Sequence, residues 1–256
     1  MIKSAVGHEQ AHHWETSVAP MLVVAGVLFL VVFGFIGWFS YHSALMAIVS
    51  AGIGVPLLLA GIAKWTGEGL THKPLVEGLS PMALSIFIVS EIFIFLSLFA
   101  AYWTMRLSAG ADWPPVGTPK EFNLVLPLIM TVILVTSSLT YHVAEVKLEQ
   151  NNLSGFRGWV FISILLGLLF LGCTVYEYQH LMHQKFTPST NAYSTAFYSI
   201  TGFHASHVLI GLGVFLAVLL AAMRGLTNKY LAFCAGLYWH FVDIVWFFVA
   251  TQIYYW

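Results

Sequence analysis

Residues 81–107 read PMALSIFIVSEIFIFLSLFAAYWTMRL, and this stretch decides the fold. At a rise of about 1.5 Å per residue, a helix of this length crosses a hydrocarbon core of about 30 Å. Glu91 is the charged residue in the middle of the stretch. A carboxylate at that depth costs at least about 2.5 kcal/mol on insertion scales. The rest of the chain must therefore give Glu91 a partner, a water-filled cavity or a proton.

The composition of the whole chain favours a membrane protein. Of its 256 residues, 59% are hydrophobic and 8% are charged. A soluble domain carries about 25% charged residues, which is enough to coat its surface. The formal net charge of −1 provides no basic face, and this argues against nucleic acid as a partner. We therefore predict an all-α integral membrane protein.

Apolar stretches of membrane-spanning length divide the chain. They predict seven transmembrane helices, at about residues 20–39, 44–63, 81–107, 123–143, 158–180, 194–223 and 231–253. No stretch shows the alternation of a transmembrane β-barrel. Residues 1–19 form a polar leader, and residues 64–80 mix charged and apolar side chains as an interfacial loop does. The predicted organisation is a leader, helices one and two in 20–63, the loop, and helices three to seven in 81–256.

The distribution of lysine and arginine predicts the orientation. Seven of these residues fall on the side of the N-terminus: Lys3, Lys64, Lys73, Lys147, Arg157, Arg224 and Lys229. The other three, Arg106, Lys120 and Lys185, fall on the opposite side. Cytoplasmic loops carry the excess of positive charge. We therefore expect the N-terminus on the cytoplasmic or matrix side and the C-terminus across the membrane.

A small set of polar side chains accompanies Glu91 inside the predicted membrane region. The sixth span contributes His204 and His207, and the seventh contributes His240 and Asp243. Side chains three residues apart lie on neighbouring positions of a helix surface, so each pair predicts a polar patch. Glu177 lies near the far end of the fifth span. These are the candidate functional residues, and none is assigned a catalytic role.

Three interpretations of this polar set compete. The histidines could ligate a metal ion or haem, since imidazole suits iron, copper and zinc. Against this, bulky aromatic residues surround them in the sequence. Glu91 and Asp243 could instead relay protons or ions in a transporter, although transporters usually show broken helices and inverted repeats. In the third interpretation, which we favour, the polar groups hydrogen-bond to one another and fix the packing of the helices.

Several longer motifs resemble one known family. SEIFIF at 90–95, FYSITGFHASHVLIG at 197–211 and YWHFVDIVWFFV at 238–249 are similar to cytochrome c oxidase subunit III of the haem–copper oxidases. Shorter matches are WPP at 113–115, the pair Glu177-Tyr178 and the element His72-x-Pro74. The resemblance covers residues 64–256.

The resemblance implies a fold and a role. Helices one and two and helices three to seven are expected to form two bundles with a V-shaped cleft that holds phospholipids. The chain is expected to carry no metal and no redox centre of its own, and to pack on subunit I, which holds the haems and copper. Subunit II and other respiratory-complex subunits are further expected partners. Support of proton uptake and of stable turnover in subunit I is the expected function.

The resemblance also implies roles for individual residues. Glu91 matches the family's carbodiimide-reactive carboxylate, and it is expected to be protonated or hydrogen-bonded because burial disfavours the charged form. Its expected neighbours are the helix faces that carry His207 and Asp243. Trp65, Glu68 and His72 are candidates for binding lipid headgroups.

Some alternatives stay open at this point. The chain could serve as the equivalent subunit of a quinol oxidase or a nitric oxide reductase, because the site of the electron donor lies on other subunits. A stand-alone proton or ion transporter is a more distant alternative. The expected location is a bacterial cytoplasmic membrane, with the mitochondrial inner membrane as the other candidate.

Overall fold

The computed structural model describes residues 17–71, 79–119 and 124–254, and all regular structure in these ranges is helical. Seven helical spans within them are long and apolar enough to cross a membrane: Ala19–Trp38, Ala44–Trp65, Met82–Asp112, Val125–Glu149, Leu153–His183, Ala192–Met223 and Lys229–Tyr254. The all-α, seven-span prediction is thereby confirmed. The chain divides into two compact units, Met1–His72 and Lys73–Trp256, which we describe separately.

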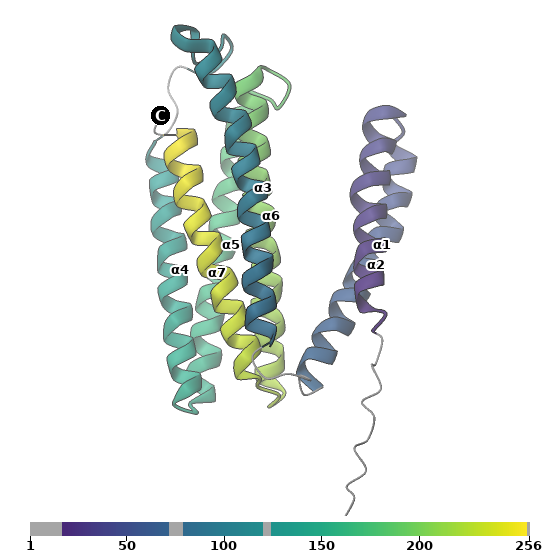
Figure 1. Cartoon of the computed structure of the whole chain (residues 1–256), viewed down its shortest axis with the longest axis vertical. Helices are drawn as coiled ribbons and strands as arrows, with labels where there is room; N and C mark the ends of the chain where they lie inside the picture. The colour runs from purple at the N-terminus through teal and green to yellow at the C-terminus, as the bar shows by residue number, and fades with distance from the viewer. Residues whose placement is uncertain (1–16, 72–78, 120–123, 255–256) are drawn as a thin grey trace, which may run out of the picture. The chain divides into compact units, whose positions relative to one another are not determined.

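The first unit is a hairpin of two helices (Figure 1). Helix α1 is Ala19–Val27, π-helical turns continue it over Leu28–Phe33 and Ile36–Ser40, and α2 is Ala44–Thr71. Glycine permits the backbones to approach closely, as is typical of packing in lipid. A Cβ atom on Gly26 would lie 2.5 Å from the backbone nitrogen of Leu58, and one on Gly54 would lie 2.6 Å from that of Leu30.

The position of the expected interfacial loop needs correction. We expected 64–80 to be irregular, but α2 continues to Thr71 and α3 begins at Leu79. The charged residues Lys64 and Glu68 form an i,i+4 pair with 3.8 Å between Nζ and Oε1, which is a helical arrangement. The mixed composition therefore belongs to the last turns of α2, which continues beyond its apolar span Ala44–Trp65. The leader residues 1–16 and the segment 72–78 lie outside the described ranges.

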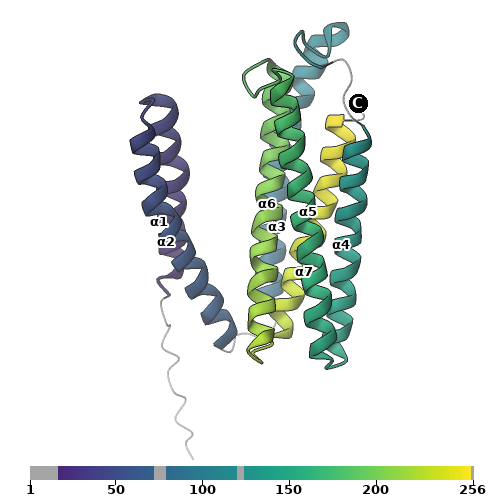
Figure 2. The ribbon, with the colours of Figure 1, turned by 180° about the vertical axis from the view of Figure 1, so that it is seen from behind.

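The second unit is a five-helix bundle (Figures 1 and 2). Its helices are α3 (Leu79–Ala109), α4 (Val125–Glu149), α5 (Leu153–His183), α6 (Ala192–Met223) and α7 (Lys229–Val249). Asparagine side chains cap the first turns of three of them, as this residue commonly does. Asn152 accepts from the amide of Gly155, Asn191 from that of Ser194, and Asn228 from those of Tyr230 and Leu231.

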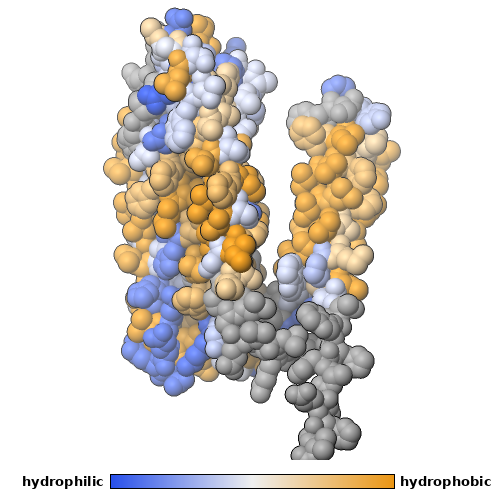
Figure 3. Space-filling view, viewed as in Figure 1, coloured by the Kyte–Doolittle hydropathy of each residue, from blue (hydrophilic) through white to orange (hydrophobic). Residues whose placement is uncertain are grey.

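The interior of the bundle is built from aromatic rings. Tyr141 and Phe215 stack with their centroids 4.1 Å apart, and Trp239 packs on Phe215 at 4.7 Å. Small residues accommodate these rings: a Cβ atom on Gly211 would lie 2.7 Å from the indole of Trp239. The outer surface of the unit is predominantly hydrophobic in its middle (Figure 3). The candidate site consists of the few polar side chains that lie in this interior, between the packed helices.

Candidate functional site

The carboxyl group of Glu91 is paired with the imidazole of His207. Glu91 lies midway along α3 and His207 midway along α6, and Nε2 of His207 is 3.1 Å from Oε2 of Glu91. The two side chains are 12% and 7% exposed, so water has little access to either. The pair thus supplies the partner that a buried carboxyl group requires, and it joins two helices that are distant in sequence.

The second ring nitrogen fixes the proton arrangement of His207. Nδ1 lies 2.8 Å from the carbonyl oxygen of Phe203. A carbonyl can only accept a hydrogen bond, so Nδ1 carries a proton. Nε2 then either accepts a hydrogen bond from a protonated Glu91 or, as part of an imidazolium, donates a hydrogen bond to the carboxylate. The pair therefore shares one mobile proton, and its net charge is zero in both arrangements.

Aromatic side chains enclose the pair. The ring of His207 lies 5.2 Å from that of Phe95 and 4.6 Å from that of Phe203, measured between centroids. The hydroxyl of Tyr238 donates to the carbonyl of His207 at 3.3 Å. These contacts come from α3, α6 and α7, so the pair sits where the three helices meet. The enclosure favours a closed hydrogen-bonded unit over an exposed acid.

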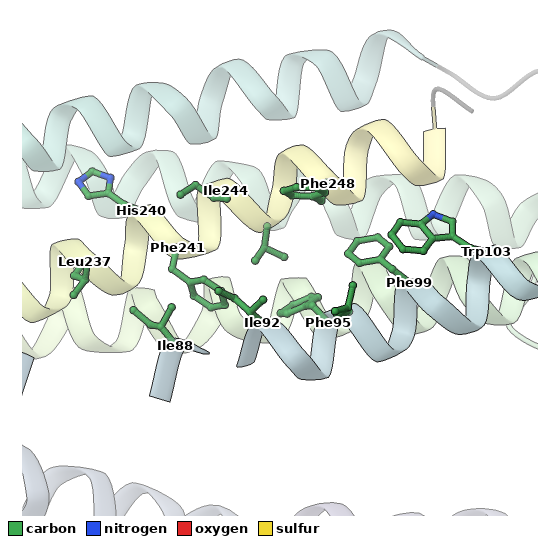
Figure 4. Close-up of a pocket in the computed structure, with 12 residues that line it drawn as sticks. Ile88, Ile92, Phe95, Phe99, Trp103, Leu237, His240, Phe241, Ile244 and Phe248 are labelled. Atoms are coloured by element: carbon green, nitrogen blue, oxygen red, sulfur yellow. The ribbon is translucent and has the colours of Figure 1, made fainter. Parts of the chain in front are cut away.

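An apolar groove of about 360 Å³ runs along α3 and α7 beside this junction. Figure 4 shows the side chains that line it, with Trp103 near one end and His240 near the other. Aliphatic and phenyl groups make up nearly all of its walls: Ile88, Ile92, Phe95, Leu96, Phe99, Leu237, Phe241, Ile244, Val245 and Phe248 complete the lining. Such a surface suits hydrocarbon and offers almost no hydrogen bonds.

Asp243 and His240 form a separate polar cluster between α4 and α7. Nδ1 of His240 lies 2.7 Å from Oγ of Ser138 on α4. Asp243 follows three residues later on α7, and its Oδ1 makes no hydrogen bond to any described residue. The expectation that the α7 face carrying Asp243 neighbours Glu91 stays a prediction. The helix-six face carrying His207 is the neighbour that the structure does place beside Glu91.

His204 and His207 differ in their contacts. His204 is 1% exposed and packs against the rings of Phe170 on α5 and Trp246 on α7. Neither of its ring nitrogens has a hydrogen-bond partner within the described part of the chain. Three residues turn a helix by about 300°, which is 60° short of a full turn. Both rings contact α7, His204 at Trp246 and His207 at Phe241, but His204 also packs on α5 and His207 on α3.

Glu177 accepts a hydrogen bond from the hydroxyl of Tyr254 at 2.7 Å. This contact ties α5 to the last described residue of the chain, in the π-helical turns Ala250–Tyr254 that follow α7. Glu177 and His180 have the Glu-x-x-His spacing of di-iron bundles, but His180 lies at the surface beside Gln184. Across 17–71, 79–119 and 124–254, no three histidine, cysteine, aspartate or glutamate side chains converge on a metal position.

Two of the three lipid-headgroup candidates are described. Trp65 is 54% exposed near the end of α2. Glu68 accepts a hydrogen bond from Ser17 at 2.6 Å and lies 3.8 Å from Lys64. His72 falls outside the described ranges.

Sequence reasoning missed the partners that connect the polar groups. The Ser138 hydroxyl, the Phe203 carbonyl and the Tyr254 hydroxyl complete the three clusters. One signal was present in the sequence: 136–140 reads TSSLT inside an otherwise apolar span. A run of hydroxyl side chains at that depth indicates a polar neighbour on another helix.

Comparison of the amino-acid sequence with known proteins identifies its family. The family model described as cytochrome c oxidase subunit III matches residues 11–256. A cytochrome c oxidase subunit 3 of Alkalihalophilus pseudofirmus is 36% identical over 197 residues, which cover 74% of this chain and 94% of the relative. The corresponding protein of Synechocystis is 38% identical over 173 residues, covering 66% and 72%. A Staphylococcus haemolyticus protein named "Probable quinol oxidase subunit 3" is 38% identical over 196 residues, covering 74% and 93%.

Proposed function

Because this chain belongs to the cytochrome c oxidase subunit III family, we propose that it is a non-redox subunit that packs on subunit I and supports proton uptake and stable turnover there. Membership makes it a subunit III of a haem–copper oxidase, and its seven spans make it an integral membrane protein. Subunit II and the remaining respiratory-complex subunits are the other proposed partners.

The commitment of the buried polar groups to one another is the observation that supports a non-redox role. His207 uses both ring nitrogens on Glu91 and a backbone carbonyl, and His240 uses Nδ1 on Ser138. A haem or metal ligand would need a free imidazole nitrogen directed at the ion. His204 has free nitrogens, but the rings of Phe170 and Trp246 pack against it. The haems and copper are therefore assigned to the partner subunits.

Removal of this chain from the purified oxidase tests the proposal. We expect haem and copper per complex to stay unchanged, while the number of turnovers before inactivation falls and proton uptake slows. A loss of haem or metal in proportion to the removed chain would refute the non-redox role. Unchanged uptake and lifetime would refute the supporting role.

Phospholipid binding is a further part of the proposal. Exposed aromatic residues at helix ends sit at the headgroup level of a bilayer. Trp65 meets this description near the end of α2, and Lys64 supplies a cation beside it for a phosphate.

We expect Trp65→Ala to reduce the phospholipid retained by the purified complex, measured by mass spectrometry. Trp38→Ala, which removes another exposed indole from the same hairpin, is the control. Equal lipid loss from both variants would refute a role specific to Trp65.

The electron donor of the complex has two candidates, cytochrome c and a quinol. Relatives named for each are similarly identical to this chain, at 36–39% and 38%. Oxygen consumption by the purified complex with reduced cytochrome c, and separately with a quinol, distinguishes them. The compared relatives from bacteria support a bacterial cytoplasmic membrane as the location. The lysine and arginine distribution supports an N-terminus on the inner side.

A further inference from the structure

A second cavity lies at one end of the five-helix bundle, between the last turns of α4 and the first turns of α7. Its volume is about 600 Å³, within the range of about 300–1,000 Å³ that is usual for ligand sites. Most of its lining is apolar surface, and a few ionisable side chains lie among the apolar ones. The lining residues that matter here are Glu145, Glu149, Lys229, Phe233, Leu237 and His240. We call this cavity the α4/α7 pocket.

Charged groups of both signs stand at the rim of the α4/α7 pocket. Glu149, the last residue of α4, and Lys229, the first residue of α7, are exposed. Glu145 lies one turn earlier on α4, is 20% exposed, and has its Oε2 at 3.7 Å from Nδ1 of His142. Its other carboxyl oxygen lies against Gly236, where a Cβ atom would have no room. The rim thus offers an ammonium group to a phosphate and carboxyl groups to a cation.

The α4/α7 pocket borders the apolar groove along α3 and α7. Leu237 and His240 line both cavities. Figure 4 places these two side chains toward one end of the groove, from which Ile88 and Ile92 on α3 and Ile244 on α7 continue the lining. A molecule whose polar part lies in the pocket can therefore extend an apolar part past Leu237 into the groove.

The distance along α7 matches the reach of one acyl chain. Lys229 begins both α7 and the seventh span, so it marks the level of the lipid headgroups. From Phe233, one turn further on, to Ile244 is 11 residues, or about 16 Å at about 1.5 Å per residue. This is about half of a hydrocarbon core of about 30 Å, the depth that the chains of one leaflet fill. A chain from a headgroup at Lys229 therefore ends beside Ile244.

The balance of charge at the rim discriminates among phospholipids. Two acids, Glu145 and Glu149, accompany one lysine, Lys229, in the lining. An anionic headgroup brings only negative charge to these carboxyl groups, and like charges placed together are unfavourable. An ethanolamine headgroup carries a phosphate for the lysine and a primary ammonium that donates hydrogen bonds to carboxylates. The rim therefore fits an ethanolamine phospholipid better than an anionic one.

We propose that the α4/α7 pocket and the adjoining half of the groove bind one phospholipid with an ethanolamine headgroup. Its phosphate binds Lys229, its ammonium binds Glu145 and Glu149, and one acyl chain lies along Leu237 and Ile244. The site lies wholly within the second unit. It is additional to the lipid proposed near the end of α2, and neither binding event requires the other.

The test counts lipids on the intact oxidase by native mass spectrometry. The complex is released from nanodiscs that contain phosphatidylethanolamine and phosphatidylglycerol in equal amounts, and every sample carries Trp65→Ala, so that the lipid proposed there does not contribute. We expect Ile244→Trp, which fills the groove, to remove one phosphatidylethanolamine per complex. Leu209→Trp on α6 is the matched control, because Leu209 is 60% exposed, Ile244 is 59% exposed, and Leu209 lies outside the groove lining.

A pair of lysine variants tests the headgroup contact, and it tests the site alone if Ile244→Trp does not assemble. Lys229→Gln is expected to raise the mole fraction of phosphatidylethanolamine that half-fills the site about fivefold, as the loss of one lysine near a membrane surface does. Lys147→Gln is the control. It removes a lysine from the same end of α4, where Lys147 bonds to Gln150 at 3.4 Å outside the pocket lining.

Four results would each overturn the proposal. The first is an unchanged phosphatidylethanolamine count in Ile244→Trp and Lys229→Gln. The second is an equal loss in these variants and in their controls. The third is a loss of phosphatidylglycerol in place of phosphatidylethanolamine. The fourth is the release of a partner subunit with an unchanged lipid count, which would show that a protein covers the pocket.

Discussion

The strength of the coupling between Glu91 and His207 follows from the geometry of the pair. Two protonation arrangements are possible, a neutral acid with a neutral imidazole or a carboxylate with an imidazolium. Hydrogen bonds between charged nitrogen and oxygen groups are about 2.7–2.9 Å long. The observed 3.1 Å between Nε2 and Oε2 is a hydrogen-bonding distance in either arrangement. We expect the neutral arrangement, because a charged group at this depth costs at least about 2.5 kcal/mol.

The two arrangements predict different energies in a double-mutant cycle. A neutral hydrogen bond between membrane helices contributes about 0.6 kcal/mol on average and at most about 1.7 kcal/mol. Removal of one partner from a buried ion pair costs about 3–5 kcal/mol, because a charge is left unpaired. For Glu91→Ala and His207→Ala we expect a coupling energy of about 1 kcal/mol, in the range of a neutral bond. We also expect Glu91→Gln to be nearly neutral, since an amide can donate to Nε2 in place of the acid.

The assay measures retention of this chain in the purified complex along a denaturant series, for the wild type, both single variants and the double variant. Trp103 and Gln252 provide a matched control, because their neutral bond of 2.9 Å joins α3 to the turns after α7. The control cycle should give a coupling of the same size. A coupling of 3 kcal/mol or more at Glu91 and His207, with a normal control, would show an ion pair and refute our assignment. A coupling indistinguishable from zero would show that the contact does not stabilise the subunit.

The remaining predictions concern packing and the chain end. Gly26→Ala should destabilise the α1/α2 hairpin by about 1–3 kcal/mol, because its Cβ would meet the backbone of Leu58, whereas Gly52→Ala, with nothing within 4 Å, should not. The thermal unfolding midpoint of the complex is measured with each glycine variant. Equal decreases for Gly26→Ala and Gly52→Ala would contradict the packing argument. Tyr254→Phe should destabilise the α5 contact by about 1–3 kcal/mol, because it leaves the buried Glu177 carboxyl without its 2.7 Å donor. Adding Glu177→Gln to that variant should restore part of the loss in the same measurement, and no recovery would count against the reasoning.

The sequence predicted the helices well because each span is long, apolar and separated by polar segments. The error at 64–80 has a physical cause. Hydropathy reports where apolar residues end, but a helix continues as long as its backbone bonds and side-chain pairs allow, and α2 does so to Thr71. Length in the membrane and length of the helix are different quantities, and only the first is encoded in apolar composition.

The cost of a buried charge predicted that Glu91 has a partner, but not which partner it has. His207 and Asp243 were equally plausible from depth alone, because both lie near the middle of their spans. The choice depends on which faces of α3, α6 and α7 meet, and that is decided by aromatic and glycine packing over the whole bundle. The hydroxyl run at 136–140 was the local signal for the contact of α4 with His240 on α7.

The two acids of the bundle differ in what water can do to them. Glu91 and His207 form an enclosed unit whose net charge is the same wherever the shared proton sits, so proton movement within it leaves the bundle's charge unaltered. No hydrogen bond joins Asp243 to an imidazole among the described residues, so a change in its protonation would change the charge of the bundle interior by one unit. A charge change at that depth is worth at least about 2.5 kcal/mol, which is enough to alter how neighbouring helices pack.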